Sequence, residues 1–110
     1  MQSPFFFMLD ELIEFAKQHY PGFTDLPERF VRALFETYKD TTLVQQNGAG
    51  EIQGFAVYQD WPELMNFILI CGVGTRAENV KMISAWAHNF TKKIVWFDES
   101  TMELKEICRQ

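Results

Sequence analysis

The sequence predicts a single α/β domain of the α+β kind over residues 1–110, built on a mixed, mainly antiparallel sheet. Three patterns predict it. Two segments with helical periodicity precede every strand-like segment, and an Asn-Gly turn joins the first two strand-like segments. Two later apolar runs then flank a glycine turn and a third helical segment, which is the order of a strand–helix–strand crossover.

Two helices are predicted at the N-terminal end. Apolar residues at helical spacing predict the first over residues 9–20, and Pro21-Gly22 ends it. Thr24 or Asp25 can cap the second, with Glu28 three residues after Asp25 in capping-box position. Its apolar stripe comprises Phe30, Val31, Leu34, Phe35 and Tyr38. The aromatic run 5–8 is predicted to be at most a short strand.

Three antiparallel strands follow. Residues 41–46 and 51–59 are rich in strand-forming residues, and the Asn-Gly turn at 47–50 predicts a hairpin between them. In the second strand alternate residues should point to opposite faces, and both faces carry apolar side chains. Residues 64–71 are nearly all apolar, which predicts a strand at the centre of the sheet.

The last third predicts a right-handed parallel crossover. Thr75 and Glu78 form a capping box, so a helix should begin at residue 76. Residues 94–97 are predicted to form a strand parallel to 64–71. Ser100 and Glu103 suit the start of a last short helix, with Leu104, Ile107 and Cys108 facing inward.

This order of elements resembles the GCN5-related N-acetyltransferase fold, truncated at its ends. The sequence Gly54-Phe-Ala-Val-Tyr58 is similar to that family's third strand, and residues 64–74 match its fourth strand. Residues 75–90 would be the helix that holds the pyrophosphate of acetyl-CoA, and 94–97 the fifth strand. The family's loop begins with Arg or Gln where Leu69 stands here, and its C-terminal hairpin is not expected. The resemblance is therefore to a minimal or degenerate member, such as phages encode.

The resemblance implies a site for acetyl-CoA at the turn between the central strand and the following helix. Gly72 and Gly74 retain the family's Gly-x-Gly. The backbone amides of Val73, Gly74, Thr75 and Arg76 would meet the pyrophosphate, and the Arg76 side chain would add positive charge. A plain glycine turn before a well-capped helix accounts for the same residues.

Acetyl transfer to an amine requires a base for the amine proton and benefits from an acid for the leaving thiolate. Asp60 and Glu63 flank Trp61-Pro62, so either carboxylate could serve as the base, and Tyr58 could donate to the thiolate. Solvated turn carboxylates and a packing tyrosine are the alternatives. A structural or surface role is predicted for both histidines, His19 and His88.

Composition favours a cytoplasmic protein with reduced thiols and no metal, nucleic-acid or membrane partner. The net charge is −5, and no basic residues precede the apolar N-terminus. The 11 Phe and 3 Trp predict a bulky core or an exposed aromatic patch involving Trp61, Trp86, Trp96 and residues 5–7. Two hypotheses follow: an acyl-CoA-binding acetyltransferase-like protein, or a noncatalytic module, phage-borne or not, that self-associates or binds a protein partner.

Overall fold

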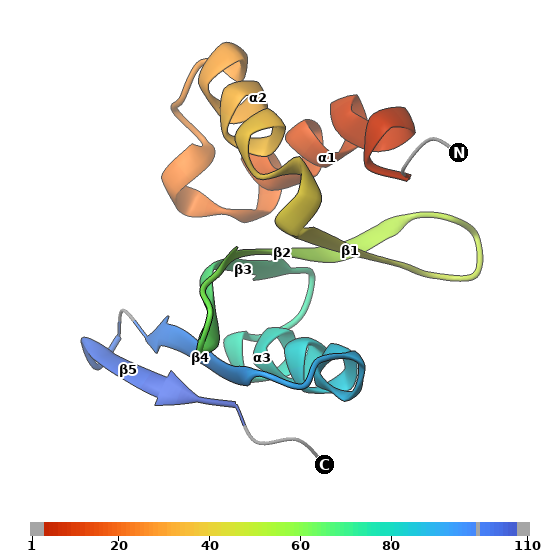
Figure 1. Cartoon of the computed structure of the whole chain (residues 1–110). Coiled ribbons are helices and arrows are strands. Elements are labelled where there is room, and N and C mark those ends of the chain that lie inside the picture. The colour runs from red at the N-terminus through yellow and green to blue at the C-terminus, as the bar shows by residue number, and fades with distance from the viewer. Residues whose placement is uncertain (1–3, 99, 108–110) are drawn as a thin grey trace.

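In the computed structural model of the chain, helices cover both faces of a five-stranded mixed sheet (Figure 1). The structure describes the backbone of residues 4–98 and 100–107, and the side chains of 8–87, 89–98 and 100–107. Helices α1 (Pro4–His19) and α2 (Glu28–Thr37) lie on one face, and α3 (Arg76–Trp86) lies on the other. The predicted α+β class is confirmed.

The N-terminal helices differ from the prediction at their starts. Residues 5–8 belong to α1 and do not form a strand, because the helical pattern extends back to Pro4, a residue that suits a first helical position. Helix α2 starts at Glu28, directly after Pro27, and no side chain caps it. The predicted capping box of Asp25 and Glu28 is therefore wrong, since Glu28 is the first helical residue and not the third. A short 3₁₀ turn, Pro21–Phe23, connects the two helices.

The predicted hairpin is present between β1 (Thr42–Gln46) and β2 (Ile52–Asp60). A second 3₁₀ turn, Lys39–Thr41, leads into it. The Oδ1 of Asn47 accepts hydrogen bonds from the amides of Ala49 and Glu51, and Gly50 has φ +83°. A side-chain acceptor and a residue free to adopt positive φ are what such a turn requires.

Two bulges change which side chains share a face. Between β1 and β2, Gln45 is opposite Gly54 but Gln46 is opposite Ile52, so Gln53 is an extra residue. Ile52 consequently lies in the same core cluster as Phe55, contrary to the simple alternation predicted for this strand. A second bulge, at Ile68, interrupts the pairing of β2 with β3 (Leu64–Gly72).

The crossover has the predicted direction, but the chain ends differently. Strand β4 (Lys93–Asp98) runs parallel to β3, after α3 and a 3₁₀ turn at Ala87–Asn89. The expected last helix is wrong: the segment Glu103–Glu106 forms β5, antiparallel to β4. Pairing with β4 outweighs the helical preference of this segment. Ile107 is buried as predicted, Leu104 is exposed, and Cys108 lies outside the described residues.

The sheet separates two hydrophobic clusters. One lies under α1 and α2 and is centred on Phe35 and Phe55, whose rings meet edge to face at 5.2 Å. The other lies under α3 and includes Met65, Phe67 and Ile83. Both faces of β2 and β3 are therefore covered, as the apolar sequences of these strands predict.

Candidate ligand-binding cleft

A cleft opens where β3 and β4 separate. The two strands pair only over Leu64–Phe67 and Lys93–Trp96, after which β3 continues to Gly72 without β4 beside it. The resulting space has a volume of about 230 Å³. Its walls include residues of both strands, of the turn before α3 and the start of that helix, and of the end of α1 with the residue after it: His19, Tyr20, Ile68, Ile70, Cys71, Gly72, Gly74, Arg76, Trp96 and Phe97.

The turn at 72–76 lies at this cleft, and its amides are only partly available. The capping box is confirmed: the amide of Glu78 donates to the Thr75 hydroxyl, and the amide of Thr75 donates to the Glu78 carboxylate at 3.1 Å. The amide of Val73 donates to the carbonyl of Gln53. Of the four amides predicted to face an anion, those of Val73 and Thr75 thus already have acceptors within the chain. Gly74 and Arg76 donate to no acceptor within the described residues.

The two glycines of the turn have a packing explanation. Neither has a positive φ. A Cβ on Gly72 would collide with Oδ1 of Asn79, whose Nδ2 group lies 3.5 Å from the Gly72 carbonyl oxygen and 3.4 Å from that of Gly74. The Gly-x-Gly sequence therefore permits the close approach of α3 to the end of β3, whether or not a ligand binds.

Asp98 at the end of β4 holds a charge cluster beside the cleft. Its carboxylate, in a residue only 5% exposed, accepts hydrogen bonds from Arg76 at 2.5 Å and Lys105 at 2.7 Å. The Ser100 hydroxyl and amide donate to it as well. Hydrogen bonds from Lys105 and Ser100 hold the pKa of Asp98 well below its usual range. Two cations around one carboxylate leave an excess of one positive charge.

Three residues of this region were not assigned to the site from the sequence. Asp98 follows the last predicted strand, where a cap or a solvated loop is the simpler interpretation, and its partner Lys105 lies in a segment predicted to be helical. His19 lies far from residues 72–76 in sequence, yet the fold brings it to the cleft. Cys71 also lines the cleft, but burial raises the pKa of its thiol to about 12, so it remains protonated at neutral pH.

The three predicted proton-transfer residues lie elsewhere. Because β2 and β3 are antiparallel, Gly54 is opposite Gly72, whereas Asp60 is opposite Met65 at the other end. That separation is roughly 20 Å at about 3.3 Å per residue. Tyr58 and Asp60 line a different hollow, and Glu63 is in an exposed turn. The structure does not bring these residues together with the turn at 72–76.

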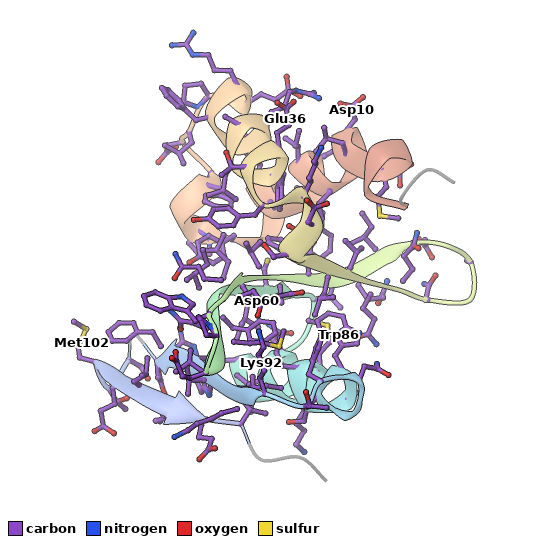
Figure 2. The ribbon with its side chains drawn as sticks, in the orientation of Figure 1. Asp10, Glu36, Asp60, Trp86, Lys92 and Met102 are labelled. Atoms are coloured by element: carbon purple, nitrogen blue, oxygen red, sulfur yellow. The ribbon has the colours of Figure 1, made fainter. Side chains whose placement is uncertain are left out.

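Asp60 is engaged in an ion pair. Its carboxylate lies 2.7 Å from the Nζ of Lys92, which also donates to the carbonyl of Trp61. Asp60 and Lys92 are both labelled in Figure 2, and both line this hollow. Burial, followed by the negative charge of Asp60, raises the pKa of Tyr58. An ion-paired carboxylate and a phenol that holds its proton more tightly favour a structural role for this end of the sheet.

The predicted aromatic patch does not form from the tryptophans. Trp61 is exposed in the turn after β2, while Trp86 and Trp96 pack on the cluster beneath α3. The side chains of residues 5–7 lie outside the described ones. Across the described chain, no group of histidine, cysteine and carboxylate side chains could hold a metal ion, and no helix there is long and apolar enough to span a membrane.

Comparison of the chain with protein-family models, with curated proteins and with solved structures gives no match.

Proposed function

We propose that the cleft between β3 and β4 binds an acyl-CoA such as acetyl-CoA. The observation that carries the proposal is the separation of two parallel strands after only four paired residues, with a cleft along the freed edge of the central strand. The resemblance to acetyltransferases assigns the same place to the cofactor.

The freed edge of β3 supports an extended ligand containing amides. Beyond Phe67, β3 has β2 on one side, and no strand among the described residues lies on the other. Backbone N–H and C=O groups need partners when water is displaced from them. The pantetheine arm of coenzyme A is extended and carries two amides, so it can pair with this edge as an added strand would.

The charge at the cleft suits phosphate groups at its mouth. Arg76 lies at the start of α3 with its side chain about half exposed, so its guanidinium can contact a ligand while Lys105 neutralises Asp98 and Ser100 donates hydrogen bonds to it. The carboxylate of Glu78 caps the same helix and opposes a diphosphate there. Coulomb repulsion from Glu78 therefore limits the affinity that Arg76 and the free amides can supply.

The proposal concerns binding and assigns no transfer reaction to Tyr58, Asp60 or Glu63, because none of them lines the cleft. Among the described lining residues, His19 carries an imidazole, the side chain that most often serves as a general base. Any acyl transfer at this site would require His19, or a group on the acceptor itself, to take the amine proton.

Calorimetric titration with acetyl-CoA and with coenzyme A tests the proposal. We expect binding in the micromolar range, with slower amide exchange at residues 68–72 in the complex. Arg76→Glu should weaken binding at least tenfold, since it reverses the charge at the mouth. Arg29→Glu is the matched control, because Arg29 is an exposed cation on α2, away from the cleft. Absence of binding, or equal weakening by the two variants, would overturn the proposal.

A further inference from the structure

The hairpin of β4 and β5 exposes an apolar surface. Phe97 and Leu104 are direct cross-strand neighbours and are 43% and 62% exposed. Met102, in the turn between the strands, is 72% exposed, and Figure 2 shows it at the tip of the hairpin. Neighbouring large apolar side chains exposed on one hairpin indicate a surface that another molecule covers.

The same hairpin ends the sheet with an unpaired edge. Strand β5 is the last in the order β1-β2-β3-β4-β5, and no described segment pairs with its outer side. The amide of Ile107 donates to the carbonyl of Ile94, so these two residues are a hydrogen-bonded pair of the antiparallel β4–β5 ladder. Hydrogen-bonded and non-hydrogen-bonded pairs alternate along an antiparallel ladder. The backbone groups of Glu103 and Lys105 therefore bond to β4, whereas those of Leu104 and Glu106 point away from β4 toward the open edge.

We propose that two copies of this chain associate by antiparallel pairing of β5 with β5, about a two-fold axis at Leu104. The sheets of the two molecules then join into one. Leu104 and its counterpart exchange both backbone hydrogen bonds, and the two Phe97–Leu104 pairs form a continuous apolar row. This inference goes beyond the cleft and does not depend on its ligand.

Charge complementarity selects the register. With the axis at Leu104, Glu103 lies opposite the partner's Lys105, and the same pair occurs again across the axis. An axis at Glu103 or Glu106 would place two like glutamates opposite each other, and an axis at Lys105 would oppose two lysines. Opposite charges at facing positions stabilise a strand pair, whereas like charges destabilise it.

The partner's Lys105 would also relieve a repulsion within each molecule. Asp98 and Glu103 are cross-strand neighbours of equal charge, and Lys105 and Arg76 neutralise Asp98 but form no ion pair with Glu103. Pairing across the axis places the partner's Lys105 opposite Glu103, and Arg76 of each molecule still pairs with its own Asp98 when Lys105 turns toward Glu103. Because a strand of four residues buries little surface, the dimer should be weak and concentration-dependent, like other interfaces below about 1,200 Å².

Sedimentation and amide exchange of the full chain test the inference. Between about 1 µM and about 1 mM, the sedimentation coefficient should rise from the monomer toward the dimer value. Over the same range, exchange at the amides of Leu104 and Glu106 should slow, while exchange at Lys105 should not change. A monomer at every concentration would overturn the inference. So would a dimer in which the Leu104 and Glu106 amides exchange as they do in the monomer.

Variants test the apolar row and the register separately. Leu104→Glu should abolish dimerisation, whereas Leu26→Glu, the same change at an exposed leucine before α2, should leave it intact. Glu103→Lys should weaken the dimer at least tenfold, because it faces the partner's Lys105, and Glu103→Gln should weaken it less. Circular dichroism checks that each variant is folded. Equal effects of Leu104→Glu and Leu26→Glu would exclude the proposed interface.

Discussion

At the scale of single residues, Asp98 connects more of the molecule than any motif identified in the sequence. It lies at the end of β4 and accepts hydrogen bonds from α3 through Arg76, from β5 through Lys105, and from the connecting turn through Ser100. A nearly buried carboxylate is costly without such partners, and three of them keep it ionised. Asp98 therefore fixes the positions of three elements around the cleft.

Replacing Asp98 by Asn should destabilise the protein at neutral pH by more than Arg76→Ala or Lys105→Ala alone, since it removes the negative charge and one of the two acceptor oxygens that Arg76, Lys105 and Ser100 share. The folded-state pKa of Asp98 is depressed, so the carboxylate makes its full contribution to the free energy of unfolding at pH values above its unfolded-state pKa of about 3.9. That contribution is lost as the pH falls below this value toward the folded-state pKa. Urea unfolding between pH 7 and pH 2.5 should show the difference between wild type and D98N shrinking below about pH 4. Asp25→Asn, at an exposed site, is the control, and a difference independent of pH would contradict this account.

Gly54 lies in a strand, as the sequence predicts, but the need for a glycine at this position is evident only from the structure. A Cβ there would lie 2.7 Å from Sδ of Met82 and 2.9 Å from the carbonyl oxygen of Cys71. Gly54→Ala should lower the free energy of unfolding by about 1–3 kcal/mol, the range for overpacking a core. Gly48→Ala, where no atom lies within 4 Å, should change it by less than about 0.5 kcal/mol. Chemical denaturation measures both, and equal losses would show that the crowding is relieved by movement.

At the scale of elements, the start of α3 combines two demands that oppose each other. The capping box stabilises the helix by placing the Glu78 carboxylate at the positive end of the helix dipole. Hydrogen bonding to Thr75, above all to its backbone amide, lowers the pKa of Glu78. A diphosphate bound at the same end would be repelled by that carboxylate. The same capping box that allows the start of this helix to be predicted from sequence therefore lowers the affinity of the helix start for an anion.

Glu78→Gln should consequently tighten acetyl-CoA binding by about two- to five-fold, because it removes the charge while glutamine can still complete a capping box. Calorimetry measures the affinity, and helix content serves as a check on the cap. Glu36→Gln, on an exposed face of α2, changes the net charge equally and should leave the affinity unaltered. Unchanged or weaker binding by the Glu78 variant would argue against phosphate groups at this helix end.

Elements with strong local signals were predictable, and elements set by pairing were not. The Asn47 turn, the apolar run of β3 and the Thr75 cap are local, so the hairpin, the central strand and the start of α3 followed from sequence. Strand β5 was predicted as a helix because Ser100 and Glu103 imitate a capping box, whereas pairing with β4 decides its structure. The bulge at Gln53, which reverses the direction of Ile52, has no sequence signal of its own.

At the scale of the whole molecule, the fold separates residues that the sequence analysis had grouped. The strand order and the antiparallel pairing of β2 and β3 place Asp60 and the turn at 72–76 at opposite ends of the sheet. The same topology brings His19 to the cleft. Such distances depend on the register of strand pairing and on the crossover connections, and neither can be inferred from hydrophobic periodicity or motif spacing. The sequence therefore indicates the turn after β3, where the cleft lies, but not the set of side chains that lines the cleft.

Phe97 connects the two proposals, because it lines the cleft and also flanks Leu104 in the exposed row. Phe97→Ala should weaken acetyl-CoA binding and dimerisation together, each roughly three- to tenfold, since it removes apolar contact from both. Leu104→Glu should affect the dimer alone, because Leu104 does not line the cleft. Phe30→Ala, at an exposed phenylalanine of α2, is the control. Titration and sedimentation on the same samples measure both effects. If Phe97→Ala weakens only ligand binding or only dimerisation, the Phe97 ring contributes to that surface alone, and the proposed link between the two is wrong.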